Sequence, residues 1–181
     1  EYERRLILLP AKFGDDGLLY TSAVRSDYPM YVPTENGDHF DAPGPDWNLL
    51  SYGKKARASS VFDDRHAPSF AFDENIKTWW SAESGNAGEW LEVDLGDVYS
   101  VHGLQVNFAD QDIRNVGGRN STCTYRYKIE ASVDGESFVT LVDKSDNVED
   151  YSHDYYELDE GQRIRYVRLT NMGEVPADGK F

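Results

Sequence analysis

Apolar and polar residues alternate with a period of two in several short segments, which constrains the fold more than any other feature of the chain. In residues 90–95, Leu91, Val93 and Leu95 alternate with Trp90, Glu92 and Asp94. Similar alternation occupies residues 104–108, 125–133 and 164–170, and the third segment ends at Asp134-Gly135, a dipeptide typical of hairpin turns. Successive side chains of a β-strand point to opposite faces, and no segment has the pattern of an amphipathic helix. The sequence from about Leu50 onward therefore predicts an all-β sandwich or barrel.

The first fifty residues differ from the rest of the chain in their sequence pattern. Residues 5–10 and 17–22 predict two short strands, and Asp15-Asp16-Gly17 predicts the turn of a hairpin between them. Residues 27–46 contain four prolines and two glycines, which preclude regular strands and indicate an irregular connector. We therefore predict two parts, residues 1–49 and residues 50–181.

The net charge of the chain restricts the classes of ligand that it is expected to bind. The net charge is −15, and phosphate-bearing partners require clustered Lys and Arg, so neither nucleic acid nor an anionic membrane surface is expected as a ligand. Twelve Tyr and four Trp are more than a core of this size needs and indicate an aromatic binding surface. Neutral sugars or cations fit this composition, and Cys123, the one cysteine, excludes an internal disulfide.

Five ordered sequence blocks after residue 57 resemble the coagulation factor V/VIII type C, or discoidin, domains, which include the family 32 carbohydrate-binding modules. The blocks are residues 58–60 (Ala-Ser-Ser), 71–80 (Ala-Phe-Asp-Glu-Asn-Ile-Lys-Thr-Trp-Trp), 89–96 (Glu-Trp-Leu-Glu-Val-Asp-Leu-Gly), 127–135 (Tyr-Lys-Ile-Glu-Ala-Ser-Val-Asp-Gly) and 165–169 (Arg-Tyr-Val-Arg-Leu). The resemblance implies an eight-stranded antiparallel jelly-roll β-sandwich of the galactose-binding domain-like type. It also implies a non-catalytic module that binds an oligo- or polysaccharide, with its last strand beyond residue 181.

The N-terminal part resembles the end of a family 43 glycoside hydrolase and its junction to a discoidin module. The similar motifs are Glu3-Arg4-Arg5-Leu6, Asp27-Tyr28-Pro29 and residues 47–52 (Trp-Asn-Leu-Leu-Ser-Tyr). This resemblance implies a parent catalytic domain in cis, with its catalytic carboxylates in earlier propeller blades. It implies a protein that is secreted, periplasmic or at the cell surface, in a bacterial host.

A calcium site is implied for the loop at residues 70–78. By resemblance, Asp73 and Thr78 supply side-chain oxygens, and Phe70 and Asn75 supply backbone carbonyls. Calcium takes six to eight oxygen ligands, and this loop is rich in them. The alternative is an ordinary Asx turn without a metal.

Sugar binding requires an aromatic surface and a few polar groups, which discoidin modules carry on loops at one end of the sandwich. Residues 60–69 and 109–124 are the corresponding loops here. Trp80 and Trp90 are expected to pack in the domain, which leaves Trp79 freer to contact a ligand. The candidate contacts are Asp64, Arg65, His66, Trp79, Asp110, Arg114, Arg119 and Asn120.

Three other functions compete with sugar binding. Asp63/Asp64 and Asp110/Asp112 are the loop carboxylate pairs that could suggest a glycosidase, but neighbouring acidic residues on solvated loops usually serve solubility, so we expect no catalysis in this segment. A second alternative is a structural accessory domain of a family 43-like arabinofuranosidase or xylosidase, without a ligand of its own. The third, an adhesion or phosphatidylserine-binding domain, is disfavoured by the negative charge.

Overall fold

The computed structural model describes residues 11–21, 48–111, 123–176 and 179–181. The chain forms two compact units, Glu1–Asn48 and Leu49–Phe181. Across the described ranges, no helix is long and apolar enough to cross a membrane.

The first unit contains a hairpin at the predicted turn, but its first strand is residues 11–13, which were not part of the predicted strand. Strands β1 (Ala11–Phe13) and β2 (Leu19–Thr21) pair antiparallel, with Phe13 opposite Leu19. Gly17 occupies the left-handed region with φ of 77°, which favours glycine at this turn. The Asp16 carboxylate accepts hydrogen bonds from the Leu18 N–H at 3.0 Å and the Tyr20 hydroxyl at 2.6 Å. The strand predicted at residues 5–10 and the connector predicted at residues 27–46 lie outside the described residues.

The second unit is built on one antiparallel sheet with the strand order β3-β4-β7-β5-β6. Its elements are β3 (Lys55–Ala58), the short 3-10 helix η1 (Pro68–Phe72), β4 (Trp90–Asn107), β5 (Tyr127–Ser132), β6 (Val139–Lys144) and β7 (His153–Asn171).

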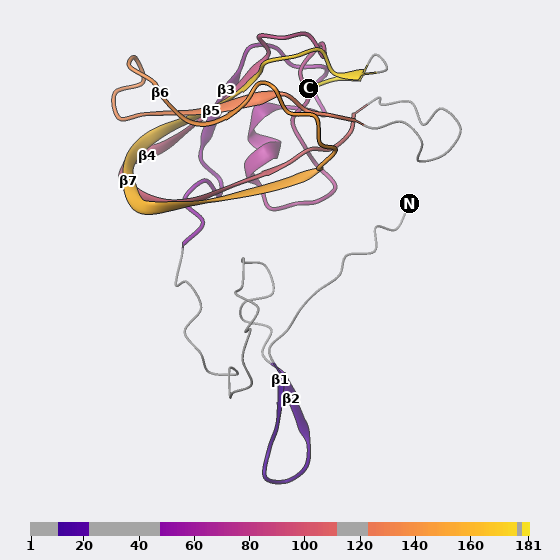
Figure 1. The fold of residues 1–181 in the computed structure, drawn as a ribbon, viewed down its shortest axis with the longest axis vertical. Helices are drawn as coiled ribbons and strands as arrows, with labels where there is room; N and C mark the ends of the chain where they lie inside the picture. Colours follow the sequence, from indigo (N-terminus) through magenta and orange to yellow (C-terminus); the bar gives the residue numbers. More distant parts are fainter. Residues whose placement is uncertain (1–10, 22–47, 112–122, 177–178) are drawn as a thin grey trace, which may run out of the picture. The chain divides into compact units, whose positions relative to one another are not determined.

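Strands β4 and β7 are long and bend from one layer of the sandwich into the other (Figure 1). Their pairing shifts register between Asp94 and Tyr99 and again between Val101 and Gly103, and such bulges increase strand bending and twist. The segments predicted separately at residues 90–95 and 104–108 are therefore parts of one strand, except that Phe108 lies just beyond its end. The predicted antiparallel β-sandwich is confirmed.

The core lies between these layers and follows the predicted alternation. Leu91, Val93 and Leu95 are buried with exposed fractions of 3–8%. Tyr127 and Ile129 of β5, which belong to the same core cluster as Leu91, have exposed fractions of 0–1%. Burial of these side chains stabilises each by about 1.5–3 kcal/mol relative to an exposed position. The sheet that carries the site is thus held rigidly.

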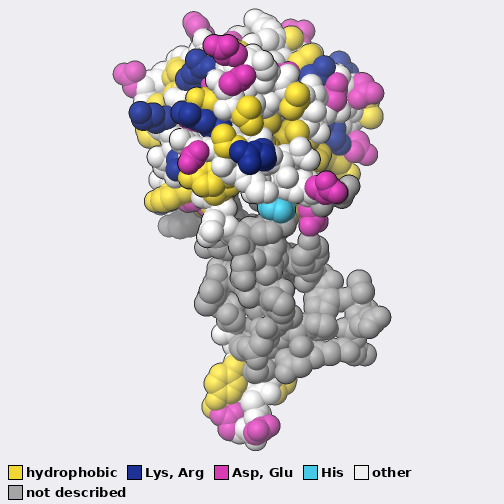
Figure 2. Space-filling model, turned by 90° about the vertical axis from the view of Figure 1, so that its left-hand side faces the viewer, with side chains coloured by type: hydrophobic (Ala, Val, Ile, Leu, Met, Phe, Trp, Pro, Cys, Tyr) yellow, Lys and Arg dark blue, Asp and Glu magenta, His cyan; other side chains and the backbone are white. Residues whose placement is uncertain are grey.

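The opposite face of the same strands carries an ion-pair cluster. Glu92 is only 2% exposed, and its carboxylate accepts hydrogen bonds at 2.6 Å from both Arg57 of β3 and Arg168 of β7. The two guanidinium groups also lie over the Trp90 ring, at 5.8 and 5.2 Å from its centre. Trp90 therefore packs within the domain, as predicted. One face of the second unit shows several Lys and Arg side chains beside hydrophobic ones, with Asp and Glu side chains scattered among them (Figure 2).

Candidate functional site

The start of the loop after β3 is held in place by the carboxylate of Glu89, which lies just before β4. Glu89 accepts hydrogen bonds from the hydroxyls of Ser59, of Ser60 at 2.7 Å and of Ser84 at 2.7 Å. Burial raises the pKa of Glu89, but the three hydroxyls outweigh burial, and its pKa lies below the usual value. Glu89 is therefore an anion that ties two separate loops together.

The next residues form an Asp-centred cluster. Asp63 accepts hydrogen bonds from Arg65 Nη2 at 2.8 Å and shares a second bond with His66 Nδ1 at 2.6 Å. The Arg65 hydrogen bond, followed by that of His66, lowers the pKa of Asp63 to about 2. A glycosidase acid needs a raised pKa, so Asp63 cannot serve as one at neutral pH. Asp64, the other member of the predicted Asp63/Asp64 pair and a predicted sugar contact, is exposed.

His66 connects this cluster to the aromatic residues. Its ring is 5.4 Å from the Phe62 ring and 5.2 Å from the Trp79 ring, measured between centroids. His66 is only 7% exposed, whereas Phe62 and Trp79 are half-buried. His66, a predicted sugar contact, is buried and contacts Asp63 and the two larger rings.

The loop that follows β4 contacts the segment between η1 and β4 at Trp79. The Trp79 indole N–H donates to Gln111 Oε1 at 3.0 Å. The neighbouring Asp110 has a left-handed backbone with φ of 54°, and Asp110 Oδ1 accepts a hydrogen bond from the buried Tyr125 hydroxyl at 3.0 Å. The predicted contacts Arg114, Arg119 and Asn120 lie outside the described residues, as does Asp112.

The C-terminal segment completes this end of the sandwich. The Lys180 N–H donates to the Gln111 carbonyl at 2.9 Å, and Lys180 Nζ donates to the Glu83 carbonyl at 2.9 Å. The same ammonium lies over the Phe62 ring, 4.9 Å from its centre. Three segments of the chain thus bring Phe62, Trp79, Gln111 and Lys180 together.

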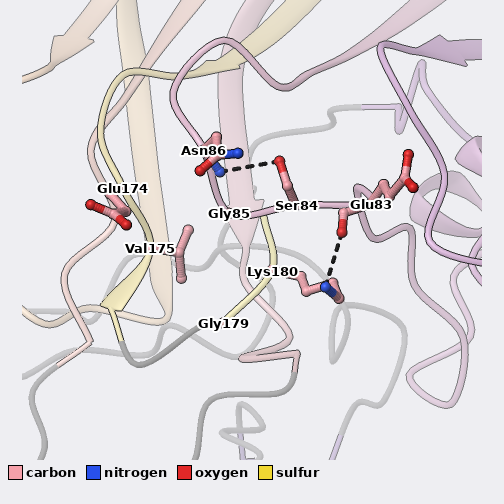
Figure 3. A pocket seen from close by; sticks show the side chains of 8 residues that line it. All are labelled: Glu83, Ser84, Gly85, Asn86, Glu174, Val175, Gly179 and Lys180. Carbon is pink, nitrogen blue, oxygen red and sulfur yellow. Dashed lines mark hydrogen bonds between the residues drawn. The ribbon is translucent and has the colours of Figure 1, made fainter.

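A polar hollow of about 200 Å³ lies beside Lys180 (Figure 3). The Lys180 ammonium points toward the Glu83 carbonyl at one side, and Asn86 lies near Ser84 at the other. The residues that line the hollow are Glu83, Ser84, Gly85, Asn86, Glu174, Val175, Gly179 and Lys180.

Gln111 and Lys180 were missed by the sequence analysis. Lys180 is more than one hundred positions from Phe62, and only the docking of Phe181 into the core brings it near. The Phe181 ring meets the Trp80 ring edge-on at 6.0 Å, and Ala82 N–H donates to the Phe181 carbonyl at 2.7 Å. Trp80 is 8% exposed and packs in the core, as predicted.

The loop predicted to bind calcium is closed on itself. Thr78 Oγ1 donates to Asp73 Oδ2 at 2.7 Å and lies 2.9 Å from the Asn75 carbonyl oxygen, while Asn75 N–H donates to Asp73 Oδ1 at 2.9 Å. Phe70 lies in η1, which leads into this loop. A carboxylate, a hydroxyl and a peptide carbonyl converge, and this oxygen donor set fits calcium chemistry. In the described part of the chain, no group of three or more His, Cys, Asp and Glu side chains is arranged to hold a metal.

The described elements of the second unit define an antiparallel β-sandwich domain. A family model, the F5/8 type C domain, matches residues 55–179. The chain therefore belongs to the F5/8 type C domain family, as the five sequence blocks predicted.

Solved structures show the same fold. Chitosan-binding module 1 from a chitosanase/glucanase of Paenibacillus sp. IK-5 superposes with a TM-score of 0.59 at 22% identity, over 72% of this chain and 90% of that chain. A family 32 carbohydrate-binding module from Clostridium perfringens, solved with galactose, has a TM-score of 0.53 at 20% identity, over 70% and 87%.

A structure described as a glycoside hydrolase extends the similarity to the first unit. It covers 94% of this chain at 21% identity with a TM-score of 0.53, and this chain spans 37% of its length. A search of curated proteins found no match.

Proposed function

We propose that the second unit is a non-catalytic carbohydrate-binding module whose ligand lies at the loop end of the sandwich. The observation that carries this proposal is the convergence of the half-buried Phe62 and Trp79 rings with Gln111 and Lys180, from three separate segments. Aromatic rings provide a surface for the C–H side of a sugar, and the amide and ammonium groups provide donors for its hydroxyls.

Charge and chemistry support a binding role over catalysis. Asp63 is held ionised by Arg65 and His66, so it provides no general acid. Exposed Arg65 projects from the same loop with 82% of its side chain accessible and can donate to a sugar hydroxyl. The similar solved modules are described as binding chitosan and galactose, which supports an oligo- or polysaccharide as the ligand class.

The parent protein is proposed to be a secreted or cell-surface glycoside hydrolase of the family 43 type. The glycoside hydrolase structure that aligns over 94% of this chain supports a catalytic domain in cis. A tethered module would raise the local concentration of the enzyme on a polymer without changing its chemistry.

A glycan array followed by calorimetric titration tests the module. The array should include arabinose, xylose and galactose oligomers, chitosan oligomers and galactose itself. We expect at least one of these to bind with a stoichiometry of one at the loop end. The competing function is a structural accessory domain, and flat titrations with every sugar would favour it and contradict our proposal.

A further inference from the structure

The ends of β4 and β7 form a two-stranded ribbon on the side of the core away from β5 and β6 (Figure 1). Gln105 is opposite Tyr155 in this ribbon, and Asn107 is opposite His153. Leu104 and Val106 of β4 and Tyr156 of β7, which have the opposite parity, pack against the core. Since side chains alternate along a strand, the first four residues face outward.

Two exposed tyrosines mark the length of this outer face. Tyr151 is 52% exposed and Tyr155 is 42% exposed, with His153 between them. The Phe108 N–H donates to the Ser152 carbonyl at 2.8 Å, which holds the segment just before β7 against the residue that follows β4. Tyr151 and Tyr155 are four positions apart in the sequence, and the chain bends at Ser152 between them.

A hydrogen-bonded amide lies beside the tyrosines. Asn107 Oδ1 accepts from Gln105 Nε2 at 3.1 Å and is 3.0 Å from His153 Nδ1. These bonds hold three polar side chains in place, so less side-chain entropy would be lost when a ligand binds. Amide groups carry both donors and acceptors, which suits the hydroxyl groups of a sugar.

We propose that the outer face of this ribbon is a second carbohydrate site, which binds an extended neutral polysaccharide chain. Two exposed tyrosines near one end of the ribbon offer two stacking surfaces, and a linear glycan provides several rings in a row. The residues that form the face are Tyr151, His153, Tyr155, Gln105 and Asn107, and none of them is Lys, Arg, Asp or Glu. The face offers no cation to an acidic glycan, and the net charge of −15 repels one.

Affinity electrophoresis of the full chain in gels containing arabinan, xylan or galactan tests this site. Tyr151→Ala and Tyr155→Ala should each raise the apparent dissociation constant for the retained polymer by about three- to tenfold, because a stacking surface is lost. Tyr155→Phe should keep most of the affinity. Tyr52→Ala is the matched control, because Tyr52 is 60% exposed on a different loop.

A trisaccharide titration separates this site from the loop site. The tyrosine variants should bind a trisaccharide at the loop end as the unmodified chain does, while Arg65→Ala should weaken that binding and leave part of the polymer retention. Unchanged polymer retention in both tyrosine variants would overturn the second site and leave the proposed function intact. Absence of retention by all three polymers in the unmodified chain would also overturn it.

Discussion

At the residue scale, Glu89 shows how one carboxylate organises the loop end of the sandwich. It accepts hydrogen bonds from serines of two loops, one after β3 and one before β4. Hydrogen bonds to a charged group contribute about 1.5–3 kcal/mol each, and loss of the charge weakens all of them together. The Ala-Ser-Ser and Glu-Trp blocks of the sequence are thus two halves of one interaction.

Glu89 also predicts how stability depends on pH. Its pKa is lower in the folded protein than the ordinary value of 4.5, because the serine hydroxyls outweigh burial. A depressed folded-state pKa gives stability that is present above pH 4.5 and is lost as the pH falls through the folded-state pKa. Glu89→Gln should therefore lower the free energy of unfolding at pH 7 by about 1–3 kcal/mol and flatten its decline below pH 4.5.

Urea denaturation from pH 7 to pH 3 measures this effect. Glu136→Gln, at an exposed position, provides the control and should match the unmodified chain at pH 7. Equal acid sensitivity of Glu89→Gln and the unmodified chain would show that Glu89 does not contribute to the pH dependence.

At the element scale, the C-terminal segment positions Lys180 by packing against the loop before β4. The Val175 N–H donates to the Gly85 carbonyl at 2.9 Å, and a Cβ atom at Gly85 would lie 2.2 Å from the Gly179 carbonyl oxygen. The Gly179 carbonyl is part of the backbone and can make room only if the whole C-terminal segment moves. Only glycine therefore fits at position 85.

Gly85→Ala should therefore displace the C-terminal segment and affect both stability and binding. Overpacking costs about 1–3 kcal/mol, so we expect that loss in the free energy of unfolding and weaker sugar binding through Lys180. Thermal denaturation and sugar titration measure the two effects. Ala87→Ser, at an exposed position in the same loop, should change neither, and full sugar affinity in Gly85→Ala would contradict this role of the segment.

The loop after η1 predicts a response to calcium. If Asp73, Asn75 and Thr78 hold the ion, saturating calcium at 100-fold over its dissociation constant adds about 2.7 kcal/mol of stability. Chelation should then lower the melting temperature by about 5–10 °C, and Asp73→Ala should abolish that change.

Glu74→Asn is the control for this loop, because Glu74 has φ of 56° and Asn tolerates the left-handed conformation. It should keep the calcium response. An unmodified chain whose melting temperature is the same with and without chelator contains an ordinary turn at this position.

At the same scale, the sequence pattern predicted elements better than it predicted their connections. Alternation identified the buried faces of β4, β5 and β7, because burial on one face leaves a period of two in the residues. It did not show that residues 90–95 and 104–108 belong to one strand, because bulges between Asp94 and Gly103 interrupt the period. Gln111 and Lys180 were missed because tertiary packing alone brings them to Trp79 and Phe62.

At the scale of the whole molecule, the charge and the aromatic residues favour the same class of ligand. A net charge of −15 disfavours polyanions, while exposed or half-buried rings occur at the loop end and on the β4–β7 ribbon. Two sites on one unit would increase the retention of an enzyme on a polymer by avidity. This arrangement suits a module that anchors a hydrolase to its substrate.

Isothermal titration of the loop-site variants with the best array ligand tests the central claim most directly. Arg65→Ala and Gln111→Ala should each weaken binding by about fivefold to tenfold, because each removes a hydrogen bond to the sugar. Lys77→Ala, an exposed cation on the neighbouring loop, should bind as the unmodified chain does. Equal affinity in all three variants would contradict a carbohydrate site at the loop end of the sandwich.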